Sequence, residues 1–378
     1  MNASQQADWS QSLGTGAPGI ALVDIEAART GAGTWGAVHR WAAAMTRDPV
    51  VADPAACGLF YGAPAVAFTL HSATQPAYKT MLDILDQHIA ALTRTRLDQA
   101  HQRIDEGRLP ALREFDLIGG LTGIGAYLLH RHRGGDLLRD VLAYLVRLIE
   151  PVTVNGEALP GWWTGDGPQG QPSPSWPGGH GNLGIAHGGS GILALMATAM
   201  RHGTTVAGQP EALARICAQL DQWRTGTDTR AWWPETISLP EWRSRTSRQR
   251  GAGRPSWCYG TPGLARAQQL AALAIDDTRL QSRAEAAMAG CLHNEDQLAQ
   301  ITDASLCHGW AGLLRATERI SADSSSGTLA DLLPGLRARL DQHRRPAHRG
   351  FLEGETGVLL AQQTGSESNW DACLLLTG

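Results

Sequence analysis

The chain has 378 residues, of which 43% are hydrophobic, and its formal net charge at pH 7 is −4. This apolar content is enough for a large buried core, and the weakly acidic balance gives no bulk attraction to nucleic acid. The sequence has no apolar run near the ~20 residues of a membrane span, and its polar start contains no apolar signal region. We therefore expect a cytoplasmic protein without an integral membrane segment, whose six cysteines stay reduced.

The periodicity of apolar residues predicts a mostly helical chain. Residues 1–18 are expected to form a flexible N-terminal tail, and residues 19–378 a single domain. Residues 19–47 predict one or two helices. Three later segments place apolar residues at helical spacing with charged residues between them, which is typical of amphipathic helices on the outside of a helical assembly. These segments are residues 77–105, 137–150 and 211–223.

A Gly-x-x-Gly step recurs along the chain, and apolar residues follow each copy. Glycines at such positions allow backbones to approach closely where a helix begins against a crowded core. The copies begin at Gly120, Gly188, Gly260, Gly309 and Gly354, with a degenerate copy at Gly62. Successive copies lie 45 to 72 residues apart, which leaves room for two helices and a loop. The spacing predicts an all-α array of helical hairpins.

Two long segments interrupt this alternation. Residues 159–182 are rich in Gly, Pro and Trp and do not favour a continuous helix. Residues 231–257 carry Trp232, Trp233 and Trp242, and five arginines follow these three. The simpler interpretation of the basic run is a solvated loop, and the alternative is a contact for an acidic peptide. Neither segment has the character of a domain linker, so one domain remains the expectation.

The strongest candidate site is formed by Cys258, Cys307 and His308, which stand directly before two of the glycine steps. Two thiolates and one imidazole are a ligand set that favours zinc. Three protein ligands leave a fourth position open, as a catalytic zinc site requires. The sequence has no Cys-x-x-Cys pair, which argues against a zinc finger. The alternative is that the two cysteines are core residues that happen to lie at helix starts.

Four motifs together resemble the LanC-type lanthipeptide cyclases. They are Asp116 before Gly119-Gly120, Ala186-His187-Gly188, Trp257-Cys258-Tyr259-Gly260 and Cys307-His308-Gly309. The resemblance covers nearly the whole chain. It implies an α/α toroid of seven inner and seven outer helices, one Zn²⁺ per chain, and addition of peptide cysteine thiols to dehydroalanine or dehydrobutyrine. Because six glycine steps are found, six to seven helical-hairpin repeats are expected. The seventh would lack the step or lie within residues 19–47.

The resemblance also assigns roles around the metal. His187 has the same offset from its glycine step as His308, so both are expected at one mouth, with His187 as the acid that protonates the enolate. Asp116 would orient His187, while Arg254 and Tyr259 would hold the substrate carbonyl or the enolate. Each has a structural alternative: a helix cap or core contact for His187, a helix-terminal acid for Asp116, a solvated charge for Arg254 and core packing for Tyr259.

The expected partners are a dehydrated precursor peptide, with leader and core, and a separate dehydratase. Two other functions remain open. One is a zinc-dependent thiol- or glutathione-binding LanC-like protein without ring-forming activity. The other is an α/α-barrel glycosidase, which needs two carboxylates that face each other across the active-site opening. Asp116 and Glu353 are the acids that stand shortly before a glycine step and could take that position. His180, in a Gly-Pro segment with no matching offset, is expected to be a loop residue.

Overall fold

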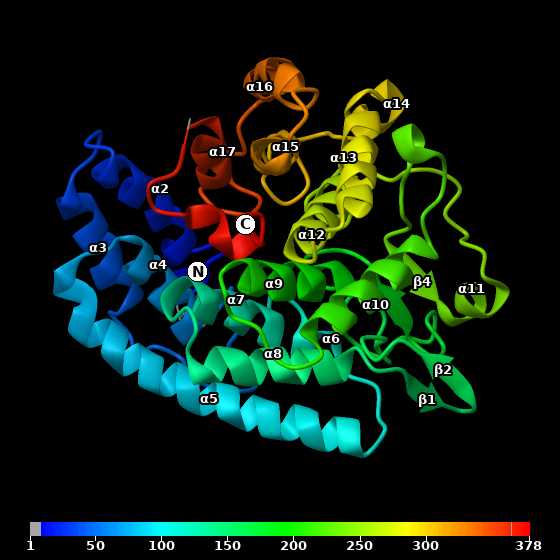
Figure 1. The fold of residues 1–378 in the computed structure, drawn as a ribbon. Helices are drawn as coiled ribbons and strands as arrows, with labels where there is room; N and C mark the ends of the chain where they lie inside the picture. The colour runs from blue at the N-terminus through cyan, green and yellow to red at the C-terminus, as the bar shows by residue number, and fades with distance from the viewer. Residues whose placement is uncertain (1–8, 364) are drawn as a thin grey trace.

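The computed structural model describes residues 9–363 and 365–378. In this part of the chain seven helices follow one another around a ring (Figure 1). Each packs against the next, and the last packs against the first, so the ring is closed. The inner helices are α2 (Ala17–Arg29), α4 (Ala63–Ser72), α7 (Leu121–Arg131), α9 (Gly189–Arg201), α12 (Thr261–Ala274), α15 (Trp310–Asp323) and α17 (Glu355–Gln362).

Six helices of the described chain form an outer layer, and each follows and packs against an inner helix. The inner helices are buried nearly all round, as α9 is from Gly189 to Ala199, whereas α8 buries only the apolar face that begins at Leu138. The architecture is an α/α toroid, and the expected helical hairpins are confirmed. The outer helices are α3 (Trp35–Met45), α5 (Lys79–Asp105), α8 (Asp136–Leu148), α10 (Gln209–Asp221), α13 (Thr278–Leu292) and α16 (Leu333–Gln342).

The second glycine of each complete step makes room for a backbone carbonyl. A Cβ on Gly123, Gly263 or Gly357 would lie 2.1 Å from the carbonyl oxygen of the residue six positions earlier. A Cβ on Gly19 would meet the oxygen of Leu13 in the same way, at 2.0 Å. The segment Gly16-Ala17-Pro18-Gly19 is therefore the seventh step, and it starts α2 as the others start their helices.

The segment before α2 belongs to the fold, which corrects the expected tail for residues 9–18. Leu13 and Ala17 are fully buried, and the Leu13 N–H donates to the carbonyl of Phe60 at 3.0 Å. Closing the ring between α17 and α2 buries this segment, and such long-range closure leaves no local sequence pattern. Residues 1–8 of the expected tail lie outside the described residues.

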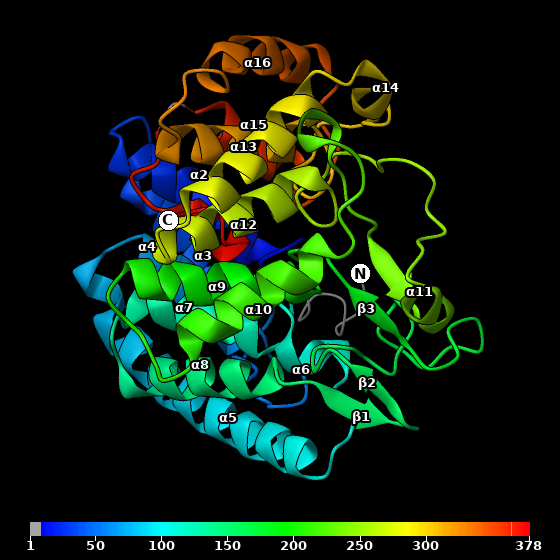
Figure 2. The same cartoon turned by 45° about the vertical axis from the view of Figure 1, so that its right-hand side comes forward.

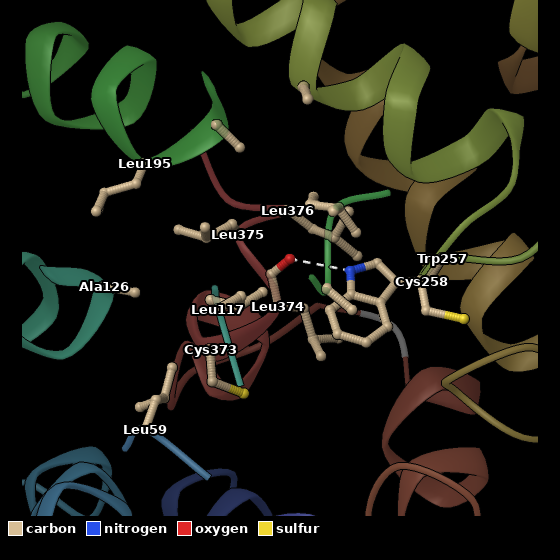
Figure 3. Close-up of a cluster of buried hydrophobic side chains, with 14 of the residues drawn as sticks. Leu59, Leu117, Ala126, Leu195, Trp257, Cys258, Cys373, Leu374, Leu375 and Leu376 are labelled. Atoms are coloured by element: carbon tan, nitrogen blue, oxygen red, sulfur yellow. Dashed lines mark hydrogen bonds between the residues drawn. The ribbon is translucent and has the colours of Figure 1, made fainter. Parts of the chain in front are cut away.

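The segment after α17 turns into the ring instead of forming a seventh outer helix. It contains the 3-10 helix η4 (Trp370–Leu374) and continues to residue 378. Figure 3 shows Leu374, Leu375 and Leu376 among buried side chains, where the Trp257 indole N–H donates to the Leu374 carbonyl at 3.0 Å. The chain end thus fills the interior that the inner helices enclose.

A buried ion pair fixes this inward segment. Asp371 is fully buried and accepts hydrogen bonds from Arg315 Nε at 2.8 Å and Arg319 Nε at 2.7 Å. Burial alone would raise the pKa of Asp371, but the two guanidinium groups hold it at about 2. Both arginines belong to α15, so Asp371 ties the chain end to an inner helix.

Two short antiparallel ribbons lie beside the toroid (Figure 2). In the first, β1 (Val152–Val154) pairs with β2 (Glu157–Leu159). In the second, β3 (His180–Asn182) pairs with β4 (Thr236–Ser238) and so joins the two long segments between helices.

Short helical turns complete the described chain. They are η1 (Pro76–Tyr78), α6 (Leu112–Phe115), η2 (Asp228–Arg230), α11 (Leu239–Ser244), α14 (Glu295–Leu298) and η3 (Ala330–Leu332). None of the helices in the described ranges is long and apolar enough to cross a membrane.

Candidate metal and catalytic site

Three potential metal ligands meet at the starts of two neighbouring inner helices. Cys258 precedes α12, and Cys307 and His308 precede α15. Their ligand atoms all lie within 4.8 Å of one another. The Cys258 N–H donates to the Cys307 carbonyl at 3.3 Å, so the two loops are joined by their backbones. The structure therefore brings together the Cys–Cys–His set that the sequence singled out.

The pKa values of the two thiols are shifted in opposite directions. A hydrogen bond from Cys307 lowers the pKa of Cys258, and the same contact raises the pKa of Cys307. The Ser256 hydroxyl, 3.6 Å from the Cys258 sulfur, also favours the thiolate. A cation between the sulfurs would remove their mutual repulsion. Cys307 is only half-buried, so the cluster is accessible from one side. Two thiols and one imidazole with such access fit a zinc ion whose fourth coordination position is open to a further ligand.

Asp303 lies beside His308, and the sequence analysis does not predict this contact. Its Oδ2 lies 3.4 Å from His308 Nε2, and its Oδ1 accepts the Ser305 N–H at 2.7 Å. A ligating histidine usually donates its second ring N–H to a carboxylate or carbonyl, which fixes the ring orientation. This arrangement would leave Nδ1 of His308 free to bind a metal ion. The available signal was a carboxylate four residues before Cys307 in the same loop.

Asp116 and His187 form a second constellation. His187 Nδ1 lies 2.6 Å from Asp116 Oδ2, and the other carboxylate oxygen accepts the Gly119 N–H at 2.7 Å. Asp116 is 4% exposed, while His187 is half-buried. A buried carboxylate that accepts a hydrogen bond from Nδ1–H leaves Nε2 of His187 as the ring nitrogen that could exchange a proton.

Backbone hydrogen bonds join the segment that carries His187 to the loop that carries Cys258. The Ile185 N–H donates to the Cys258 carbonyl at 3.0 Å, and the Leu183 N–H donates to the Glu235 carbonyl at 3.1 Å. The ring of Tyr259 lies 6.1 Å from that of His187. The pairing of β3 with β4 therefore aligns the segment that carries His187 with the segment that leads to Cys258.

Tyr259 and Arg254 flank the cysteine. Burial raises the pKa of Tyr259 to about 12, against the opposing effect of the Asn182 amide, so its hydroxyl keeps its proton near neutral pH. The pKa of Cys258 is lowered first by Cys307 and further by the positive charge of Arg254. The structure thus brings the predicted residues together around one site.

Comparison with known proteins identifies the family. Residues 7–375 match the lanthionine synthetase C-like proteins. The chain belongs to this family. The nisin biosynthesis protein NisC of Lactococcus lactis subsp. lactis is 23% identical over 311 residues, which cover 80% of this chain and 72% of that protein. The solved structure of a nisin cyclase matches with a TM-score of 0.81 at 22% identity, covering 97% of this chain and 92% of that chain. That structural likeness establishes a shared toroid fold.

Two other residues of this lanthionine synthetase C-like protein differ from expectation or lack a role. His180 lies fully buried in β3 rather than in a loop; its Nδ1 lies 2.8 Å from the Asp166 carbonyl, and its Nε2 has no hydrogen-bond partner in the described ranges. Glu353 is exposed, and its charge adds to the raised pKa of Cys307 after the contact with Cys258 and burial. It therefore lies near the cysteine pair.

The carboxylates do not suit a glycosidase. Asp116 already accepts hydrogen bonds from His187 and from the Gly119 amide, which commits both of its oxygens. A retaining or inverting glycosidase needs two carboxyl groups that face the sugar. Together with the family membership, this leaves the glycosidase alternative without support.

Proposed function

We propose that the protein closes thioether rings in a dehydrated precursor peptide. A cysteine thiol of the peptide adds to the β-carbon of dehydroalanine or dehydrobutyrine, which gives lanthionine or methyllanthionine. The observation that carries the proposal is the junction of the Cys258–Cys307–His308 cluster with the Asp116–His187 pair, joined through the Ile185–Cys258 backbone hydrogen bond. The family membership and the name of the relative, nisin cyclase, support the same reaction.

Cys258, Cys307 and His308 would hold one zinc ion. When bound, zinc lowers the pKa of an incoming peptide thiol, and the two protein thiolates keep the sulfur of that thiol electron-rich. Asp303 would hold His308 in the orientation that presents Nδ1.

The remaining residues of the site act on the other end of the double bond. As the carbon–sulfur bond forms, the π electrons move to the neighbouring carbonyl oxygen as an enolate, and the thiol proton leaves to solvent. Tyr259, whose hydroxyl keeps its proton, and Arg254, whose charge acts on Cys258, would donate hydrogen bonds to that oxygen. His187, with its Nδ1 proton held by Asp116, delivers a proton from Nε2 to the α-carbon. The product is an isomer of the substrate.

We also propose that the described chain works as one domain in a reducing, cytoplasmic setting. All six cysteines are unpaired, in line with such a setting. Because the substrate must arrive dehydrated, a separate dehydratase is the proposed partner.

The test is to incubate zinc-loaded protein with a dehydrated, cysteine-bearing precursor and to count free thiols by alkylation. Loss of alkylatable thiol without a change in peptide mass is expected, because ring closure is an isomerisation. Persisting thiols with a matching precursor would contradict the proposal. His187→Ala separates a cyclase from a protein that only binds thiols: a pure binder keeps its thiol affinity and loses nothing else.

A further inference from the structure

Residues 243–254 run from the end of α11 to the loop that carries Cys258, and they include five arginines; we call this segment the arginine strap. Its backbone is held by side chains other than those arginines. Glu241 Oε1 accepts the Arg248 N–H at 2.6 Å. Gln297 and Gln300, in and just after α14, donate to the carbonyls of Gly253 and Ala252 at 3.0 and 3.2 Å. Side chains outside the strap thus hold its backbone at residues 248, 252 and 253.

Most charges of the strap are not neutralised within the described chain. Arg248 and Arg250 are exposed, and no carboxylate of the described residues lies within ion-pairing distance of either. Arg245 lies 4.3 Å over the ring of Trp242 and donates to Gln222 at 3.2 Å, so it too has no acidic partner. Arg243 alone among the exposed four pairs with an acid, Glu157. Three exposed arginines without an acidic partner thus lie close together in sequence on a chain of net charge −4, and such local positive charge favours an anionic partner.

We propose that the arginine strap binds an acidic stretch of the peptide substrate and directs the attached cysteine towards the metal cluster. This inference rests on the proposed function. The strap ends at Arg254, four residues before Cys258 and close enough for its charge to act on that thiol. Arginine is suited to carboxylates, because its planar guanidinium donates two parallel hydrogen bonds to one carboxyl group.

A peptide fits the strap better than single-stranded nucleic acid does. Sequence-tolerant binding of single strands relies on exposed aromatic rings that stack on bases. The nearest ring, Trp242, is only half-exposed and already lies under Arg245. The large hydrophobic side chains exposed in the described ranges are Met81 and Ile84, both on α5. The strap therefore carries positive charge but has no fully exposed aromatic ring on which a base could stack.

The test is fluorescence anisotropy with a labelled peptide rich in Glu and Asp, and with the same peptide carrying Gln and Asn instead. The variant R245Q/R248Q/R250Q removes three strap charges and leaves the anchoring side chains in place. The control R40Q/R47Q/R94Q removes three exposed arginines that lie on or after α3 and on α5 and have no ion pair in the described chain. Both variants have the same net charge, so the comparison isolates position.

The wild type should bind the acidic peptide more tightly than the neutral one, with an affinity that falls as salt is added. The strap variant should lose about tenfold in affinity for the acidic peptide, because three exposed charge contacts are removed, and the control variant should change little. Equal affinities for strap variant and wild type, an equal loss in the control, or preferred binding of a single-stranded RNA oligonucleotide would overturn the proposal.

Ring closure is measured separately on a dehydrated substrate without acidic residues, where the strap variant should match the wild type. If the wild type binds the acidic peptide but closes no ring on any substrate, the proposed function fails, and only the binding of acidic peptides by the strap stands. If rings close without preference for acidic peptides, the strap assignment fails alone.

Discussion

Asp116→Asn tests the proposed proton donor with almost no change in shape. One carboxylate oxygen of Asp116 accepts the Gly119 N–H at 2.7 Å, and the other lies 2.6 Å from His187 Nδ1. Because the Gly119 N–H can only donate, the amide oxygen of the new asparagine must face it. The amide NH₂ then faces His187, so Nδ1 has to accept a hydrogen bond and the ring carries its proton on Nε2 in the neutral form.

A neutral imidazole is a much weaker acid than an imidazolium, so protonation of the enolate should fail. Loss of a hydrogen bond to a charged group costs about 1.5–3 kcal/mol. Loss of a positioned general acid typically lowers a rate by about 10²–10⁴-fold. We expect kcat for ring closure by Asp116→Asn to fall within that range. The zinc content should not change, because Asp116 lies outside the cluster of ligand atoms.

The assay is single-turnover ring closure, followed by thiol alkylation and mass analysis, with zinc measured on the same preparation. Asp140→Asn, an exposed change on the outer helix α8, is the matched control and should close rings at the wild-type rate. A kcat for Asp116→Asn close to that of Asp140→Asn would refute the role given to the Asp116–His187 pair.

Three further substitutions test other parts of the account. Asp303→Asn should weaken zinc binding by about 10–100-fold, measured by competition with a chromogenic chelator; unchanged affinity would show that Asp303 does not orient His308. Tyr259→Phe should lower kcat by about tenfold or more, as expected for loss of one donor to an oxyanion. Since burial raises the pKa of Tyr259 to about 12, the wild-type rate should show no loss near the ordinary tyrosine pKa of about 10, and a loss there that Tyr259→Phe abolishes would contradict this assignment. The pKa of Asp371 is about 2 in the folded protein, below its unfolded value of about 3.9, so its contribution to stability is present above the unfolded pKa and is lost as pH falls towards 2. Asp371→Asn, which leaves Arg315 buried without its charge partner, should cost about 3–5 kcal/mol in denaturant unfolding; a cost below about 1 kcal/mol would refute the importance of this pair.

The helical repeats were readable from sequence because their cause is local. A carbonyl six residues before the second glycine excludes any side chain there, as at Gly123 and Gly263, so the requirement recurs in every complete step. The step at Gly16 has the same cause but stands in a short polar and glycine-rich start that resembles a tail. Its burial depends on closing the ring against α17, which is a contact between the two ends of the described chain.

The candidate site, too, was predictable from the sequence only in part. Cys258, Cys307 and His308 were recognised because each stands at a fixed offset from a glycine step. The contribution of Asp303 depends on which ring nitrogen of His308 it meets, and this is set by loop geometry rather than by spacing. Likewise, the sequence of the basic run does not predict that Gln297, a residue over forty positions away, donates a hydrogen bond to its backbone.

The metal content of the purified protein tests the central claim most directly. Protein prepared without chelators should contain one zinc ion per chain by elemental analysis. Cys258→Ala and Cys307→Ala should each lose that zinc while keeping the helical circular dichroism of the wild type. A folded wild-type protein without stoichiometric zinc, or full zinc retention in both cysteine variants, would contradict the account.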